Sequence, residues 1–293
     1  MQIRRRTVLA IPLLLFTACE KSRLNGKSGP SDAGGAVRVV SLSPGTTEAI
    51  FAIGSGNRLV GRSRYCDHPA AAVKLPSVGG FIDPSLEAIL GLSPDLVIGV
   101  MGPGGPKIAE QLEARGIASY FPPTDSLEQI QNMLRGLGDR LGARGGAEKI
   151  TQRIAAQSRA VRDAVQPRKR PRAVFLFGLR PIVVAGRGGF ADEMLRMAGA
   201  SNAVSSERYP TLGIEQVIAL DPDVLVDATG ASGHAGETVN KDTTGFRELR
   251  AVKQGRVITI HDDRVLRPGP RVGEGLIVLA KALHPGLGVR PVP

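Results

Sequence analysis

The stretch SLEAILGLSPDLVI, residues 85–98, decides the fold because a second version of it follows as GIEQVIALDPDVLV, residues 213–226. Four of the 14 aligned positions are identical, and six others exchange one aliphatic residue for another. Each copy has the pattern of a short amphipathic helix, a Pro-Asp turn and a buried strand. A period of 128 residues is too long for a solenoid, so the repeat predicts two related lobes.

Strands and helices alternate on both sides of the first copy. Strands are predicted at 37–42, 58–63, 96–100 and 117–121, and helices at 47–54, 86–92, 106–115 and 125–137. Thr46 or Thr47 is the expected N-cap of the first helix, which ends at Gly54. Alternation with short turns is typical of an α/β lobe with a parallel sheet.

A long helix is predicted over residues 147–166, where no Gly or Pro interrupts the pattern and Pro167 stops it. At about 1.5 Å per residue it spans roughly 30 Å, which is long for a crossover helix. Its expected buried stripe consists of Ile150, Ile154, Val161 and Val165, with Ser158 filling the gap.

A second strand–helix series follows. Strands are predicted at 172–178, 182–186, 223–228 and 256–260, and helices at 190–199, 214–220, near 244–250 and at 273–283. The predicted fold class is α/β, with two Rossmann-like lobes whose central sheets are of the parallel type. One long rigid helix joins them, and ligands of such folds bind in the cleft between lobes. The predicted domains are residues 37–146, the linking helix 147–166 and residues 167–293.

The N-terminus has the pattern of an export signal. Three arginines at 4–6 precede a nine-residue apolar run at 8–16, which is too short to span a membrane. LFTAC resembles the lipobox of bacterial lipoproteins, which implies a signal peptide at 1–18 and lipidation of Cys19. Cleavage without lipidation and twin-arginine export are the alternatives. Residues 19–36 are polar and rich in Gly and Ser, as in a flexible tether.

Charge and cysteine content narrow the function classes. The net charge is +11, and its densest cluster outside the signal is Arg168, Lys169, Arg170 and Arg172. The cluster follows a predicted helix, contains no aromatic residue and is expected to be solvated surface, with attraction to anionic lipid as the alternative. An exported chain is not expected to bind nucleic acid. Cys66 is expected to be a small buried residue.

No catalytic constellation is evident. The four histidines, His68, His234, His261 and His284, are scattered, and HExxH and CxxC are absent. We therefore expect surface or loop histidines, no metal site, no resident cofactor and no enzymatic activity. The glycine-rich stretches at 102–107 and 186–189 lack nucleotide-binding patterns and are expected to be turns.

Five segments, taken in order, resemble the long-helix periplasmic binding proteins of cobalamin and iron-chelate ABC importers, with the cobalamin branch most similar. They are RVVSLSPGTTEAIFAIG, RSRYCDHP, VGGFIDPSLEAILGLSPDLVI, RYPTLGIEQVIALDPDVLV and LRPGPRVGEGL, and the resemblance covers residues 37–285. It implies a monomeric periplasmic protein that captures a chelate and delivers it to a permease dimer.

The resemblance also implies a set of ligand-binding residues in the cleft: Ser43, Pro44, Tyr65, Phe81, Met101, Arg180, Tyr209 and Arg271. Aromatic faces and arginines suit a large flat ligand with a polar rim. The cobalamin branch typically uses tryptophans here, and this chain has none, so Phe81 and Tyr209 stand in for two of them. A corrinoid is the first expected ligand, and an iron-siderophore or haem is the second.

Glu87 and Glu215 occupy matched positions in the two copies of the repeat. In the family that the chain resembles, one glutamate of each lobe pairs with permease arginines. Both are therefore expected to be docking residues, exposed on the same face, one per lobe, and flanking the mouth of the cleft. A carboxylate in a first helical turn is also favoured by the helix dipole, which is the simpler reading.

An α/β enzyme and an anchored sensor with a degenerate cleft are the other function classes considered for the whole chain.

Overall fold

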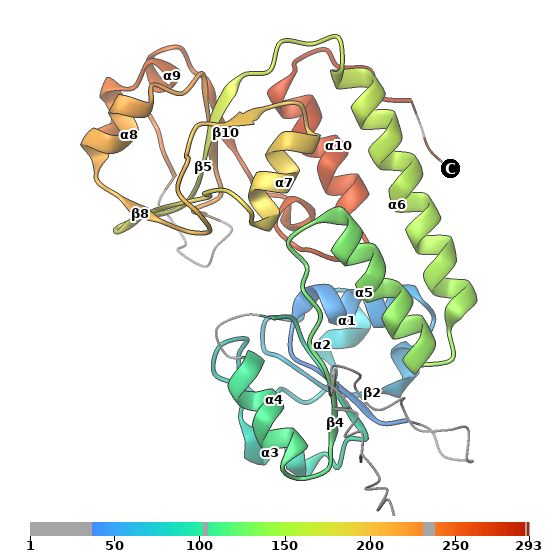
Figure 1. The fold of residues 1–293 in the computed structure, drawn as a ribbon. Coiled ribbons are helices and arrows are strands. Elements are labelled where there is room, and N and C mark those ends of the chain that lie inside the picture. The colour runs from blue at the N-terminus through green and yellow to red at the C-terminus, as the bar shows by residue number, and fades with distance from the viewer. Residues whose placement is uncertain (1–36, 102–104, 231–237, 291, 293) are drawn as a thin grey trace, which may run out of the picture. The chain divides into compact units, whose positions relative to one another are not determined.

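The computed structural model describes residues 37–101, 105–230, 238–290 and 292, which form two α/β lobes with a long helix between them in the chain (Figure 1). The predicted signal peptide, the tether, Cys19 and His234 lie outside the described residues. None of the described helices combines the length and the apolar content that a membrane span requires.

The first lobe contains a four-stranded sheet that is parallel, as predicted, with its strands in the order β2-β1-β3-β4. Its strands are β1 (Val39–Ser41), β2 (Leu59–Arg62), β3 (Leu96–Ile98) and β4 (Ala118–Tyr120). Its helices are α1 (Pro44–Ala52), α2 (Ala70–Val73), α3 (Leu86–Gly91), α4 (Gly105–Glu113) and α5 (Leu127–Arg140), with a 3-10 turn at Gly56–Arg58. The central strands β1 and β3 are buried along their whole length, which explains their uninterrupted aliphatic sequence.

The predicted cap of the first helix was wrong. Ser43 is the N-cap: its backbone is extended, and its Oγ accepts a hydrogen bond from the N–H of Thr46 at 3.4 Å. Pro44 follows at the first helical position, where its fixed φ suits the helix and its missing N–H is not needed. Thr46 and Thr47 therefore lie inside the helix, and both are buried.

The long helix is α6 (Arg144–Val165), three residues longer at its start than the predicted 147 and one residue shorter at its end. Gly146 allows the earlier start, because a side chain there would collide with the backbone of Ile53. The predicted stripe is buried as expected. α6 packs against α5 near its start and against α10 (Val272–Leu283) near its end (Figure 1), and one apolar cluster continues along it from β1 to α10.

The second lobe contains a mixed sheet in the order β10-β9-β5-β6-β8, with β7 beside β5. The strands are β5 (Arg172–Leu179), β6 (Ile182–Val184), β7 (Ser201–Asn202), β8 (Thr211–Leu212), β9 (Val224–Asp227) and β10 (Val257–Thr259). The helices besides α10 are α7 (Phe190–Met197), α8 (Ile214–Leu220) and α9 (Arg250–Lys253), with 3-10 turns at Phe246–Glu248 and Asp263–Val265.

Two predictions for this lobe need correction. β6 runs antiparallel to both β5 and β8, because the chain turns back directly after β5 in a tight hairpin at Arg180 and Pro181. The helix predicted near 244–250 is instead a 3-10 turn followed by the single turn of α9. Leu249 separates them, because its backbone is extended.

In each copy of the repeat, hydrogen bonds join the Pro-Asp turn and the end of the helix to the residue before the neighbouring strand. In the first lobe, Asp95 of the Pro-Asp turn accepts a 2.7 Å hydrogen bond from the N–H of Arg38, the residue before β1. The Arg38 guanidinium in turn donates to the Leu92 carbonyl just past the end of α3, at 2.8 Å. Helix end, turn and neighbouring strand are thereby fixed together.

The second lobe repeats this arrangement. Asp223 accepts from the N–H of Arg172 at 2.9 Å, and the Arg172 guanidinium donates to the Leu220 carbonyl at 3.0 Å. Val39, which follows Arg38, pairs with Leu96, and Ala173, which follows Arg172, pairs with Val224. The two central strands of each lobe are therefore aligned in the same register in both lobes. The conserved Pro-Asp of the two copies therefore sets strand alignment.

Candidate functional site

The carboxyl ends of the first-lobe strands surround Phe81. Its half-buried ring lines a small cavity with Leu42, Gly99 and Phe121, each of which directly follows a strand. This is the edge of a parallel sheet where ligands of α/β folds bind. Phe81 therefore lies at this edge of the sheet, and its contact with a ligand stays a prediction.

Tyr65 follows β2 on the same side of the sheet and is 52% exposed. The Arg64 guanidinium lies 5.2 Å from its ring centroid, within the range of a cation–π contact. Asp83 accepts two hydrogen bonds from Arg64, the shorter at 2.7 Å, and so holds that side chain in place. The result is an exposed phenol beside a fixed positive charge.

Ser43 and Arg271 lie near each other but are engaged inside the protein. The Ser43 hydroxyl is buried and caps α1. The Arg271 guanidinium makes two 2.7 Å hydrogen bonds to the carboxylate of Glu48, which lies on α1. Their predicted contacts with a ligand are not tested by this arrangement, but both side chains already have structural partners.

Glu48 is the residue of this region that sequence reasoning missed. Its side chain is only 2% exposed, and it also accepts from Arg267 at 3.1 Å. Arg267 binds Asp67 at 2.6 Å, and that hydrogen bond holds the pKa of Asp67 below its ordinary value. A glutamate in the otherwise small and apolar segment TTEAIFAIG was the available signal, because buried carboxylates are rarely unpaired.

The backbone between Arg267 and Arg271 touches the start of α1. A side-chain carbon on Gly269 would lie 3.1 Å from the Cα of Gly45, and one on Gly45 would collide with the Pro268 carbonyl. Two glycines therefore permit the close crossing of segments from the two lobes. We call the group Glu48, Arg267 and Arg271 the interlobe ion cluster.

Tyr209 lies at a second point where the lobes meet. It is 50% exposed, and its ring packs edge-on against Phe177 with 5.5 Å between the centroids. The neighbouring Arg208 pairs at 3.0 Å with Asp125, which precedes α5 in the first lobe. Partial burial raises the pKa of the Tyr209 phenol, and the nearby Asp125 carboxylate raises it further. Tyr209 is thus neutral at physiological pH and faces the other lobe.

The remaining predicted ligand residues are dispersed. Arg180 is exposed at the β5–β6 hairpin and lines a cavity of about 670 Å³ with Thr238, Asn240 and Thr243 of the second lobe. Met101 is 59% exposed at the edge of the described residues. Among the cavities formed by the described residues, Phe81 and Arg180 line separate ones, and the joint role of the predicted set in binding one ligand stays a prediction.

Glu87 and Glu215 are both exposed, each at the second position of its helix. Ile89 of α3 and Val217 of α8 are buried on the opposite side of their helices. The exposure of the two carboxylates is therefore confirmed, and their docking role stays a prediction.

The cysteine prediction is confirmed and one histidine prediction is wrong. Cys66 is fully buried, accepts a hydrogen bond from Thr47 at 3.1 Å, and has its thiol pKa raised by burial. His68 and His261 are exposed, but His284 is buried, because the end of α10 packs it against the backbone of Ala198 and Gly199. Within the described residues, no three or more His, Cys, Asp or Glu side chains are grouped to hold a metal.

Comparison with known proteins decides the family. The family profile described as periplasmic binding protein matches residues 39–264. The chain belongs to the periplasmic binding protein family. Among periplasmic binding proteins with curated names, the vitamin B12-binding protein of Photorhabdus laumondii is 31% identical to it over 243 residues, which are 80% of this chain and 84% of that one.

Solved structures of periplasmic binding proteins share its two-lobed fold. The haem-binding protein RhuT from Roseiflexus sp. RS-1 is 32% identical, with a TM-score of 0.76 over 85% of this chain and 98% of that one. The vitamin B12-binding protein BtuF of Vibrio cholerae is 25% identical, with a TM-score of 0.74 over 84% and 96% of the two chains. The family and its periplasmic location are thereby shown, while relatives carry two kinds of ligand.

Proposed function

We propose that this periplasmic binding protein captures a corrinoid and delivers it to the permease dimer of an ABC importer. The observation that carries the proposal is the similarity to vitamin B12-binding relatives over four fifths of the chain. We further propose that the protein acts as a monomer anchored through a lipid on Cys19.

The exposed aromatic residues support a flat ligand. Tyr65 and Tyr209 are half exposed on different lobes, and Phe81 lies at the carboxyl ends of the first-lobe strands. A corrinoid is a broad macrocycle with amide groups on its rim, so aromatic faces would pack on the ring and Arg180 would meet the rim.

Haem is the second candidate because of one local feature. A tyrosine oxygen is an established haem ligand, and the phenol of Tyr65 is half exposed beside the Arg64 guanidinium. Similarity to the haem-binding RhuT supports the same alternative. An iron-siderophore would use the exposed arginines and remains the third ligand to test.

Replacing Tyr65 by phenylalanine should separate these ligands, because it removes only the phenol oxygen. The measurement is calorimetric titration with cyanocobalamin, cobinamide, haemin and a ferric siderophore. If the ligand is a corrinoid, Tyr65→Phe should change Kd by no more than about threefold, whereas Tyr65→Ala should weaken binding by about tenfold through lost ring packing. If it is haem, Tyr65→Phe should weaken binding by about tenfold or more and abolish the phenolate–iron absorption band.

The third tyrosine, Tyr120, provides the matched control. It stacks with Arg140 at 3.8 Å on the α5 side of β4, so Tyr120→Phe should leave every Kd unchanged. Failure of all four compounds to bind the wild-type protein would contradict the proposed function and favour an anchored sensor.

Loss of both exposed glutamates should impair transport without impairing capture. In cells that contain the cognate permease, Glu87→Gln/Glu215→Gln should reduce ligand uptake at least about tenfold, since two charge-assisted contacts with the permease would be lost. Kd of the purified protein should not change. The control is Glu110→Gln/Glu113→Gln, which removes two exposed charges from α4. Normal uptake by the first variant would refute the docking role.

A further inference from the structure

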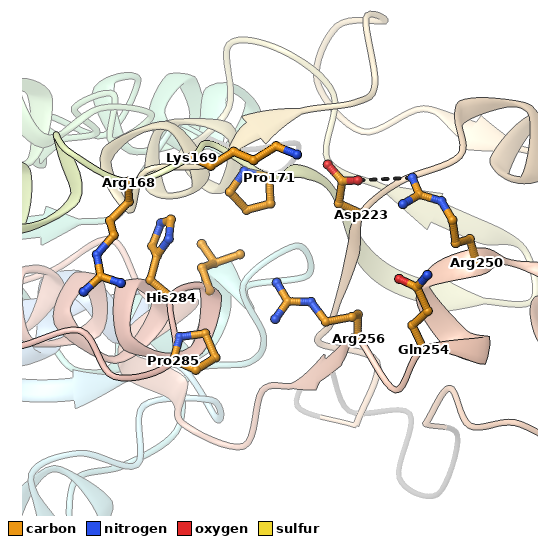
Figure 2. Close-up of a pocket in the computed structure, with 10 residues that line it drawn as sticks. Arg168, Lys169, Pro171, Asp223, Arg250, Gln254, Arg256, His284 and Pro285 are labelled. Carbon is orange, nitrogen blue, oxygen red and sulfur yellow. Dashed lines mark hydrogen bonds and ion pairs between the residues drawn. The ribbon is translucent and has the colours of Figure 1, made fainter.

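A second cavity lies at the opposite edge of the second-lobe sheet. It measures about 400 Å³ and is lined by Pro171, which precedes β5, by Asp223, which precedes β9, and by Arg256, which precedes β10 (Figure 2). The three strands are parallel, so these residues share the amino edge of the sheet. Arg180 follows β5 at the carboxyl edge, which makes the cavity distinct from the proposed ligand site.

The lining of this cavity is strongly positive. It contains four cations and one carboxylate, a balance of +3. The carboxylate, Asp223, pairs with Arg250 (Figure 2) and also accepts a hydrogen bond from the Arg172 N–H. Arg250 also binds Asp221. Within the described residues, the other three cations form no ion pair; they are Arg168, Lys169 and Arg256.

The arrangement of these cations concentrates their field. Arg168 and Arg256 lie on either side of His284 and reach the cavity from the segment after α6 and the segment before β10 (Figure 2). Both charges, after burial, help to hold the pKa of His284 below its ordinary value, so they act on the same small volume. Four cations around one carboxylate that is already hydrogen-bonded repel one another, and an anion among them would reduce that repulsion.

We propose that this cavity binds a phosphate group, either free or as the ester of a lipid headgroup. Two guanidinium groups can each donate paired hydrogen bonds to phosphate oxygens, and Lys169 adds a point charge. The volume lies within the range of small-molecule sites, so it accepts a glycerol phosphate as well as a bare phosphate. The Gln254 amide at the rim suits the hydroxyls of a glycerol moiety.

The test compares pocket and control variants in the same full-length chain, so that N-terminal residues contribute equally. Arg168→Gln/Arg256→Gln removes two pocket charges, and Lys149→Gln/Arg159→Gln removes two exposed charges from α6. Calorimetry with sodium phosphate and glycerol 3-phosphate should show saturable binding that the pocket variant weakens at least about tenfold, because two charge-assisted contacts are lost. The control should match the wild type. Lys169→Gln, an exposed change that should not affect folding, should weaken binding less but in the same direction.

Binding to lipid vesicles shows whether the phosphate group belongs to a lipid headgroup or is free in solution. Co-sedimentation uses vesicles of phosphatidylcholine, alone or mixed with phosphatidylglycerol. A phosphatidylglycerol-dependent gain that the pocket variant loses and the control keeps assigns the site to lipid headgroups, whereas binding of the soluble phosphates alone assigns it to free phosphate. Bound phosphate should also raise the pKa of His284, as followed by NMR titration of the ring. Absence of saturable binding in both arms, or equal losses in the pocket and control variants, would overturn the proposal.

Discussion

Glu48→Gln should lower the free energy of unfolding by about 3 kcal/mol. The carboxylate is almost fully buried and holds two arginines that are themselves only 18–20% exposed. Removing one partner of such a group leaves buried charge without compensation, which typically destabilises by about 3–5 kcal/mol. We expect the lower end of that range, because Arg267 would retain its ion pair with Asp67 and both arginines would retain their ion pairs with Asp263.

Thermal and urea unfolding measure this change. A loss of about 3 kcal/mol corresponds to a decrease in Tm of roughly 6–12 °C for a chain of this size. Glu113→Gln, an exposed change on α4, should stay within about 0.5 kcal/mol of the wild type. The double variant Glu48→Gln/Arg271→Gln should lose less than the sum of the single variants, since they share one interaction. Additive losses would show that the interlobe ion cluster is not an energetic unit.

Asp227→Ala should also cost about 3 kcal/mol or more. This carboxylate, at the end of β9, is fully buried and accepts hydrogen bonds from the N–H and hydroxyl of Thr229 and from the N–H of Val239 at 2.6 Å. Alanine would remove the acceptor of these three hydrogen bonds, at about 1–3 kcal/mol for each donor left unsatisfied. The chain from Val239 onward lines the cavity with Arg180, so that wall should loosen as well.

Denaturant unfolding gives the change in stability, and hydrogen exchange at the Val239 amide reports the local effect. Asp227→Asn should fall between alanine and the wild type, because an amide oxygen can still accept on one side. Asp242→Ala is the nearby exposed control. A stable Asp227→Ala variant with a protected Val239 amide would mean that other groups hold this segment.

The sequence predicted the lobes well because repetition and periodicity are local signals. The stripe of α6, the parallel first-lobe sheet and the helix–turn–strand units all follow from spacing within one segment. The antiparallel β6 escaped prediction because IVVAG fits a buried strand of either direction, and only the Arg180–Pro181 hairpin decides between them. Ser43 escaped prediction because three nearby hydroxyl-bearing residues, Ser43, Thr46 and Thr47, are all suitable N-caps.

The site was less predictable, because its partners are distant in the sequence. Exposure of Glu87 and Glu215 follows from helical faces and was predicted correctly. The pairing of Glu48 with Arg271 spans 223 residues, and no periodic pattern encodes it. The basic cluster was expected to be solvated surface, and its four members are exposed. Sequence spacing could not show that Arg256 joins Arg168 and Lys169, because that follows only from the parallel order of β9 and β10.

The unbroken apolar cluster through α6 has a mechanical consequence for the proposed function. The side chains of β1, α6 and α10 pack in one apolar cluster. Moving the lobes apart would separate close-packed side chains of this cluster. A bound chelate would therefore not be released by spontaneous hinge motion. Unloading would require mechanical work from the transporter, applied at both lobes and drawn from its nucleotide hydrolysis.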